Sequence, residues 1–320
     1  MIGPSDPPLA EPSEFQIGLS PELPPRPESG HKGTFGTVCV VGDCAEKPTV
    51  MLGAAAMCGQ AAMRAGAGRC VLAVPEPLAV AAGCIAPTAT LAGLPVNAQG
   101  QLLASAAAEI VDRIIDSASV VAIGCGLGTG ESVQQLVLHL LTQDRCPIVL
   151  DADGLRALAA IVDVGPDIRA PLVVTPHPGE YRLLADAFQI EADPVSEKER
   201  SAAAQLLAQR LGAVVVLKGP STVVSDGQQI WISDVGNVAL ATGGSGDILT
   251  GVIASFIGQW SEGAGSIGRK LITSAISGVF VHGSAGDQWA HRNGKTGMLA
   301  TDLLTEIPTA IAAIRDSQGC

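Results

Sequence analysis

Aromatic side chains are scarce in this sequence, since Phe, Trp and Tyr together make up only 3% of its 320 residues. The hydrophobic residues, 47% of the chain, must therefore build a core mainly from Ala, Val, Leu and Ile. The chain has 38 glycines, and short runs of β-branched residues recur along it. This composition is typical of an α/β protein with tight loops.

Clusters of basic residues and long apolar runs are also missing. The chain has 19 basic and 31 acidic residues and a formal net charge of −12, which disfavours a nucleic-acid partner. An anionic ligand would have to be held by backbone N–H groups and a few placed cations. No apolar run reaches the roughly 20 uninterrupted residues of a membrane span. The N-terminus lacks the pattern of a secretion signal, so we expect no membrane partner and a cytoplasmic location.

Cysteine occurs at eight positions, but none belongs to a Cys-x-x-Cys pair. A zinc site is therefore not expected, and a disulfide framework is unusual in a chain of this length. Most of the eight lie inside apolar runs. We interpret them as buried small hydrophobic residues in a reducing compartment.

The N-terminal part differs in composition from the rest. Residues 1–30 contain eight of the 21 prolines and several acids, which is typical of an arm or a poorly ordered leader. An arm that packs on a neighbouring subunit is an open alternative. Residues 31–320 show no internal repeat and no linker, so we expect a single domain there.

From residue 37 onward, short apolar runs alternate with helix-like segments. Because these runs are continuously apolar, they indicate a mostly parallel central sheet that helices cover on both faces. Residues 221–233 differ, because two strand-like runs flank Asp226 and Gly227, a signal for a hairpin with a type I′ turn. Three helix-like segments follow it. The expected strands are 37–42, 69–75, 119–124, 147–153, 172–176 and 213–219, and the clearest helices are 51–68 and 201–212.

Polar and glycine-rich residues follow the ends of these strands. Ligands of open parallel sheets bind outside the carboxyl ends of the strands, so these residues are expected at one functional edge. They are Gly42 and Asp43, residues 124–128, Asp151 and Asp153, residues 175–180, and residues 218–222.

The segment ATGGSGDILTG, residues 241–251, places four glycines around a single acid, Asp247. An apolar face with helical spacing follows, so a helix is expected to begin near Gly246 or Asp247. Unpaired N–H groups at a helix start, reached closely through glycine, form a hole for a transferred phosphate. Asp247 could then act as a general base toward a hydroxyl. Alternatively, Asp247 or Ser245 caps the helix.

This segment resembles the anion-hole and base motif of the ribokinase-like superfamily. Seven further stretches, in order from about residue 31 to 310, resemble the ADP/ATP-dependent NAD(P)H-hydrate dehydratases. The resemblance implies a ribokinase-like fold and a stand-alone dehydratase domain. The stretches are HKGTFGTVCVVGD (31–43), GAAAMCGQAAMRAGAGRCVLAVPE (53–76), AIGCGLG (122–128), VLDADGL (149–155), TPHPGE (175–180), LKGPSTVV (217–224) and GMLATDLLTEIP (297–308).

The resemblance implies a hydro-lyase that repairs hydrated NADH or NADPH. In this family ADP or ATP, with Mg²⁺, phosphorylates the hydroxyl of the hydrated nicotinamide ring, and departure of phosphate restores the dihydropyridine. A homo-oligomer, tetrameric or larger, is implied too, and a separate NAD(P)H-hydrate epimerase is a candidate pathway partner. Two alternatives stay open: a ribokinase-like kinase of a vitamin alcohol, and a non-catalytic nucleotide-binding protein.

Residue roles follow from the matching motifs, with Asp247 as the catalytic base. Five of the other assignments have a structural alternative. Lys218 could be a strand-end residue that solvates its charge, Ala54 an ordinary helix-interior residue, and His177 a loop residue without a role. Gly126 and Gly128 could form an ordinary tight turn. The implied substrate contacts are Asp247, Ala54, Gly126, Gly128 and His177, and the implied nucleotide contacts are Lys218, Gly219, Pro220, Ser221, Thr222, Gly244 and Gly246.

Ribokinase-like kinases usually carry Asn-x-x-Glu where this chain has His177 and Glu180. The histidine indicates a substrate contact and disfavours the kinase alternative, while Glu180 remains a candidate Mg²⁺ ligand. Asp151 and Asp153 could orient water or Mg²⁺, or could cap the following helix. The 42–53 loop departs from the family, because it is longer and has Asp43 in place of a glycine, which could alter the fit of the substrate.

Overall fold

The computed structural model describes residues 21–161, 167–260 and 265–317. Its centre is one sheet in the order β3-β2-β1-β4-β5-β6-β7-β8-β9, parallel from β3 to β7 and antiparallel for β8 and β9. The bounds are β1 Thr37–Val41, β2 Arg69–Pro75, β3 Thr90–Leu94, β4 Val120–Ile123, β5 Ile148–Leu150, β6 Leu172–Val174, β7 Val214–Leu217, β8 Val223–Ser225 and β9 Ile230–Ile232.

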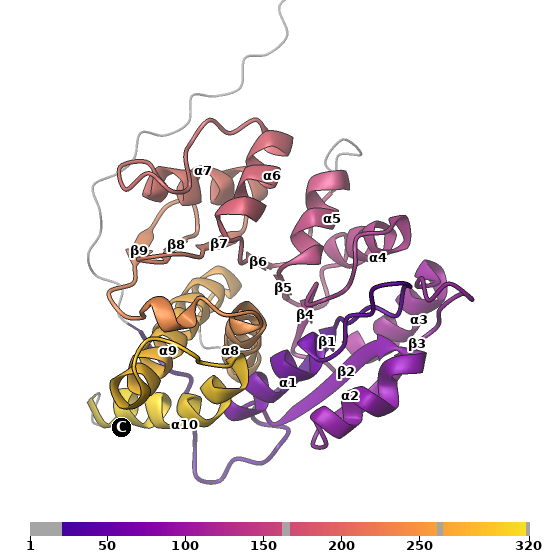
Figure 1. Ribbon diagram of the computed structural model, residues 1–320, viewed down its shortest axis with the longest axis horizontal. Coiled ribbons are helices and arrows are strands. Elements are labelled where there is room, and N and C mark those ends of the chain that lie inside the picture. The colour runs from indigo at the N-terminus through magenta and orange to yellow at the C-terminus, as the bar shows by residue number, and fades with distance from the viewer. Residues whose placement is uncertain (1–20, 162–166, 261–264, 318–320) are drawn as a thin grey trace, which may run out of the picture.

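Helices cover both faces of this sheet (Figure 1). The helices α3 to α7 lie on one face, while α1, α8 and α9 lie on the other, with α10 packed outside them. Their bounds are α1 Ala54–Arg64, α2 Ala79–Ile85, α3 Ala104–Ile115, α4 Glu131–Leu141, α5 Asp153–Ile161, α6 Pro178–Phe188, α7 Arg200–Leu211, α8 Ser245–Gln259, α9 Ile267–Asn293 and α10 Ala300–Ser317, with short 3-10 turns η1 Glu76–Leu78 and η3 Val238–Leu240.

Strand β1 shows why the strands read as continuous apolar runs. Cys39 and Val41 point into the core shared with α3, α4 and α5, whereas Val38 and Val40 point into the core shared with α1 and α8. Successive side chains of a strand face opposite sides, so a strand covered twice must be apolar at every position. The predicted α/β class, the mostly parallel sheet and the helices on both faces are confirmed.

The predicted strands are found in order, but most are shorter than the apolar runs. The run 147–153 gives only Ile148–Leu150, because Asp151 ends the strand and Asp153 already begins α5. Strand β3 was missed, since its edge position leaves Thr90 and Leu91 exposed and breaks the apolar pattern. The hairpin is confirmed, but the type I′ turn is wrong: only Gly227 has a positive φ there, and that turn needs two such residues.

Residues 21–30 of the predicted arm lie against the domain. The N–H of Glu22 donates to Ser277 of α9, and the Arg26 guanidinium stacks 3.9 Å from the centroid of the Phe35 ring. Arg315 of α10 donates to the carbonyl of Pro24. The remainder of the arm, residues 1–20, lies outside the described residues, so its boundary at residue 30 stays a prediction.

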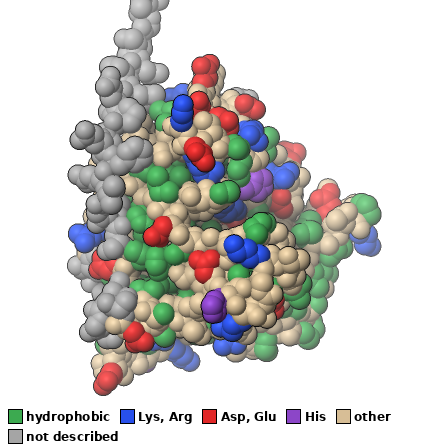
Figure 2. Space-filling model, turned by 60° about the vertical axis from the view of Figure 1, so that its left-hand side comes forward, with side chains coloured by type: hydrophobic (Ala, Val, Ile, Leu, Met, Phe, Trp, Pro, Cys, Tyr) green, Lys and Arg blue, Asp and Glu red, His purple; other side chains and the backbone are tan. Residues whose placement is uncertain are grey.

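One face of the described surface agrees with the charge pattern of the sequence. On the face in Figure 2, Lys and Arg side chains are scattered among acidic and apolar ones and form no continuous basic stripe. Among the described helices, none combines the length and the apolar character needed to cross a membrane.

Candidate active site

The glycine-rich loop leads directly into α8. The helix begins at Ser245, and its N-cap is Gly244, with φ 89°. The expected start at Gly246 or Asp247 was therefore slightly late, and neither Asp247 nor Ser245 occupies the capping position. A Cβ on Gly244 would lie 2.9 Å from Met57 and 3.0 Å from Ala300, so only glycine fits the turn.

His282 of α9 holds the first residue of α8. Its Nε2 lies 3.0 Å from the carbonyl oxygen of Ser245 and 3.1 Å from the hydroxyl oxygen. Burial lowers the pKa of His282 to about 4, so the imidazole is neutral at physiological pH. Its Nε2–H therefore donates to the Ser245 carbonyl. This contact fixes the first residue of α8 at the end of the glycine loop.

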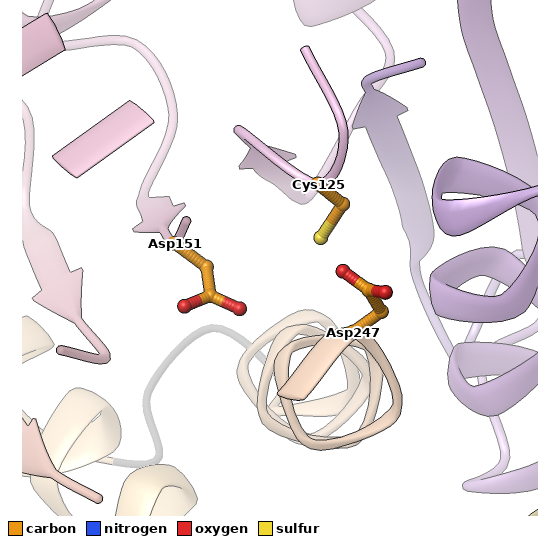
Figure 3. A group of neighbouring side chains, drawn as sticks. All are labelled: Cys125, Asp151 and Asp247. Atoms are coloured by element: carbon orange, nitrogen blue, oxygen red, sulfur yellow. The ribbon is translucent and has the colours of Figure 1, made fainter. Parts of the chain in front are cut away.

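Asp247 lies in the first turn of α8, in a cluster with Cys125 and Asp151 (Figure 3). One ligand atom from each of the three lies within 4.8 Å of the others. Burial, together with the nearby Asp151 carboxylate, raises the pKa of Asp247 to about 7. A carboxylate whose pKa lies near neutrality is suited to accept a proton from a substrate hydroxyl.

Asp151 links three elements at the edge of the sheet. Its Oδ1 accepts a hydrogen bond from Nζ of Lys218 at 2.7 Å, and its Oδ2 accepts one from the Thr250 hydroxyl of α8 at 2.8 Å. Burial is the largest effect on the pKa of Asp151 and raises it, but the charge of Lys218, together with hydrogen bonds from Lys218, Thr175 and Thr250, holds that pKa below its usual range. Asp151 therefore stays ionised and positions Lys218, so the capping alternative for Asp151 is wrong.

Lys218 is also near Glu180, whose Oε2 lies 3.8 Å from Nζ. The two carboxylates outweigh burial and raise the pKa of Lys218. A Cβ on Gly246 would lie 3.3 Å from Nζ of Lys218, so the ammonium stands beside the start of α8. The structure thus brings a fixed positive charge to the predicted anion hole.

A cavity of about 810 Å³ opens in front of this group. Its walls include His177, Glu180 and Asp247, together with the glycines at the start of α8. All seven predicted nucleotide contacts line it: Lys218, Gly219, Pro220, Ser221, Thr222, Gly244 and Gly246. The volume is within the usual range for a site that takes a nucleotide-sized ligand.

His177 is the N-cap of α6. Its Nδ1 accepts hydrogen bonds from the N–H groups of Gly179 and Glu180, and the Glu180 carboxylate accepts one from the N–H of His177 at 2.9 Å. This reciprocal arrangement is a capping box. The alternative of a loop histidine without a role is therefore wrong, and about half of the side chain remains exposed toward the cavity.

The remaining predicted substrate residues, Ala54, Gly126 and Gly128, do not line this cavity. A Cβ on Gly126 would lie only 3.1 Å from Cβ of Ala54, so these two residues are neighbours. The Asp43 carboxylate accepts hydrogen bonds from the N–H groups of Gly53 and Ala55, and its charge raises the pKa of Asp247. The altered 42–53 loop thus binds the first N–H groups of α1 and lies near the cluster of Cys125, Asp151 and Asp247.

Asp153 has a different structural role from Asp151. It is the first residue of α5, and its Oδ2 accepts a hydrogen bond from the N–H of Gly128 at 2.9 Å. Within the described ranges, the cluster with metal-ligand spacing is Cys125, Asp151 and Asp247, and it contains neither Asp153 nor Glu180. Asp153 therefore holds the glycine-rich loop after β4.

Sequence reasoning missed His282, Thr250 and Cys125 as parts of this site. Thr250 follows Asp247 by three residues, so the helical period could have placed it near the same face. His282 is a single polar residue within an apolar helical segment, which suggests a buried contact but not its partner. Cys125 lies within residues 124–128, which were expected at the functional edge, but it was interpreted as a small buried side chain and given no role.

The fold and the site define an α/β enzyme that combines an anion hole, a fixed lysine and a carboxylate with a pKa near neutrality. Comparison with known proteins agrees. The family model for NAD(P)H-hydrate dehydratase matches residues 38–309, and the chain belongs to this family.

The bifunctional NAD(P)H-hydrate repair enzyme Nnr of Moorella thermoacetica is 37% identical over 302 residues, which cover 92% of this chain and 53% of that protein. The chain spans about half the length of such bifunctional relatives. The ADP-dependent (S)-NAD(P)H-hydrate dehydratase of Bacillus subtilis is 34% identical over 292 residues, 89% of this chain and 92% of that protein.

Solved structures agree with the fold. A crystal structure of the Bacillus subtilis ADP/ATP-dependent NAD(P)H-hydrate dehydratase, co-crystallised with ATP/Mg²⁺, matches with a TM-score of 0.69 and 30% identity, covering 91% of this chain and 94% of that one. A ribokinase-like superfamily protein of Enterococcus faecalis matches with a TM-score of 0.73 at 23% identity, covering 91% and 92%. The predicted ribokinase-like fold is confirmed.

Proposed function

We propose that this protein is a hydro-lyase that uses ADP or ATP to return hydrated NADH or NADPH to NADH or NADPH. The observation that carries the proposal is the position of Asp247, a carboxylate with a pKa of about 7, beside the N-terminus of α8 and the ammonium of Lys218. The family match over residues 38–309 supports it and does not favour the vitamin-kinase or non-catalytic alternatives.

In the proposed reaction, Asp247 removes the proton from the hydroxyl of the hydrated ring. The hydroxyl oxygen then bonds to the terminal phosphorus of the nucleotide, and the bond from that phosphorus to the bridging oxygen breaks. N–H groups at Gly244 and Gly246, with Lys218, stabilise the charge on the transferred phosphate. Phosphate is a better leaving group than hydroxide. The lone pair of the ring nitrogen expels it, and loss of a proton from the neighbouring ring carbon restores the double bond.

Mg²⁺ fits this cavity in its usual manner, with one or two carboxylates and nucleotide phosphates as ligands. Glu180 and Asp151 line the cavity and supply carboxylates. One oxygen of each already accepts a hydrogen bond within the protein, from the N–H of His177 and from Nζ of Lys218. The thiol of Cys125 is a poor ligand for this hard cation. When bound, Mg²⁺ would neutralise charge on the phosphates.

We further propose that His177, Ala54, Gly126 and Gly128 contact the hydrated dinucleotide.

A homo-oligomer, tetrameric or larger, and a separate epimerase are proposed as partners. Support for an oligomer is an apolar surface at Val50, Met51 and Leu52, which are between 43% and 46% exposed. A cytoplasmic location is supported by seven free cysteines among the described residues.

The test uses purified protein and chemically prepared hydrated NADH. Return of the dihydronicotinamide absorbance is followed with ADP, with ATP and without nucleotide, each with and without Mg²⁺. We expect recovery only with nucleotide and Mg²⁺. Recovery at full rate after exhaustive removal of nucleotide, or none with either nucleotide, would overturn the proposal.

A further inference from the structure

Arg200, the first residue of α7, is a buried cation that the proposed chemistry does not use. Only 8% of the residue is exposed. Its Nη1 donates to the carbonyl oxygen of Pro194 at 2.6 Å, and its Nη2 donates to the carbonyl oxygen of Leu217 at 2.8 Å. The Nε–H has no hydrogen-bond partner in the described part of the chain.

The charge of Arg200 is not balanced within the free protein. Both of its acceptors are neutral carbonyls, and the adjacent Glu199 instead accepts a hydrogen bond from the N–H of Asp193. Burial lowers the pKa of Arg200, and no carboxylate among the described residues counteracts it. A cation at a helix N-terminus is disfavoured by the helix dipole as well. An unpaired buried charge raises the free energy of the folded protein. This indicates that a negatively charged ligand balances the charge of Arg200.

The guanidinium lies directly behind the loop 218–222. A Cβ on Gly219 would lie 2.6 Å from Nη2 of Arg200, and Gly219 has a φ of +145°, so this close approach requires glycine. The hydrogen bond to Leu217 fixes the residue that precedes Lys218. Gly219 lines the cavity and Arg200 does not, so the loop separates the guanidinium from the cavity.

We propose that Arg200 is a positioning residue for the phosphates of the nucleotide. It holds the loop 218–222 through Leu217 and Gly219, and the phosphates balance its charge across the loop once the nucleotide is bound. The inference rests on the proposed nucleotide-dependent function. It predicts that the contribution of Arg200 grows with the number of phosphates on the ligand.

The test is calorimetric binding of adenosine, AMP and ADP, with Mg²⁺, to the wild type and to Arg200→Met, Arg200→Lys and Arg210→Met. For Arg200→Met we expect ADP binding to weaken about tenfold or more, AMP binding less, and adenosine binding by less than about twofold. Arg200→Lys keeps the charge and should recover most of the ADP affinity. Arg210 lies exposed in the last turn of the same helix, so Arg210→Met should bind all three ligands like the wild type.

Thermal unfolding supplies the second measurement. Because the unpaired cation is costly in the free protein, Arg200→Met should keep the Tm of the unliganded protein while the rise of Tm with ADP becomes smaller. Equal weakening for all three ligands, no weakening, or a large fall in the unliganded Tm would overturn the inference. A wild type that fails to bind ADP would instead contradict the nucleotide-dependent function itself, and this inference with it.

Discussion

The ammonium group of Lys218 lies 2.7 Å from Oδ1 of Asp151, and this ion pair joins the end of β7 to the end of β5 beside the start of α8. Both groups are largely buried, so their attraction is less screened than at a surface. The same Asp151 carboxylate raises the pKa of Asp247. One carboxylate therefore positions the fixed cation of the site and helps to set the basicity of Asp247, the proposed general base.

Replacing Asp151 with Asn should shift the pH dependence of the enzyme. Loss of the negative charge lowers the pKa of Asp247, so the acid limb of kcat/KM should move to lower pH, and KM for ADP should rise as Lys218 loses its partner. The measurement is a pH–rate profile at several ADP concentrations. Thr250→Val is the matched control, because it removes another hydrogen bond of Asp151 without a change of charge. An acid limb that stays in place would contradict the role of Asp151.

Asp247→Asn should keep the fold and nucleotide binding but abolish most turnover. Loss of a general base typically costs about 10²–10⁴ in rate, roughly 3–5 kcal/mol of barrier. Removing a carboxylate that faces the phosphates could even tighten ADP binding. The measurements are kcat for hydrated NADH, the Kd of ADP and the Tm. A kcat close to that of the wild type would show that Asp247 is not the base.

The wild-type enzyme should lose activity as the pH falls through about 7, because Asp247 is then protonated and cannot accept the substrate proton.

The raised pKa of Asp247 also affects the stability of the protein. The folded-state pKa of Asp247 lies above the ordinary 3.8, so folding disfavours the carboxylate form. This penalty is absent at pH values below the unfolded pKa, grows as the pH rises to about 7 and is constant above it, at roughly 1.4 kcal/mol per unit of raised pKa.

The penalty can be isolated with the Asp247→Asn variant, since the asparagine side chain carries no charge at any pH. The free energy of unfolding of Asp247→Asn minus that of the wild type should be larger at pH 8 than at pH 4. Chemical denaturation at both pH values measures this difference. A difference that is independent of pH would show that the pKa of Asp247 is not raised.

His177→Asn should raise KM for the hydrated dinucleotide more than KM for ADP. Asparagine is a good N-cap, so α6 should keep its start, and the change should act on ligand binding and not on the fold. His177→Ala, which removes the cap as well, is the control that reports the cost of losing it. If only the dependence on ADP or Mg²⁺ changes, His177 belongs to the phosphate side of the cavity.

Several features of the fold followed from local residue patterns. The apolar runs and the hairpin signal predicted the strands other than β3 in their correct order, because a strand buried on both faces must be apolar throughout. The glycines around Asp247 and the apolar face behind it predicted a helix start next to a carboxylate. Strand β3 was not predicted, because an edge strand with exposed residues has no continuous apolar run.

The sequence by itself therefore determined the class of the fold. It also determined which residues, Lys218 and Asp247 among them, lie at the functional edge of the sheet. Only the tertiary structure decided their chemistry. Asp151 comes from a strand end that is remote in sequence from Thr250 and Lys218, and His282 reaches Ser245 from another helix. The pKa of Asp247 depends on burial and on the distance to these remote charges. Both quantities exist only once β5, β7 and α8 are packed together, so no local pattern can encode them.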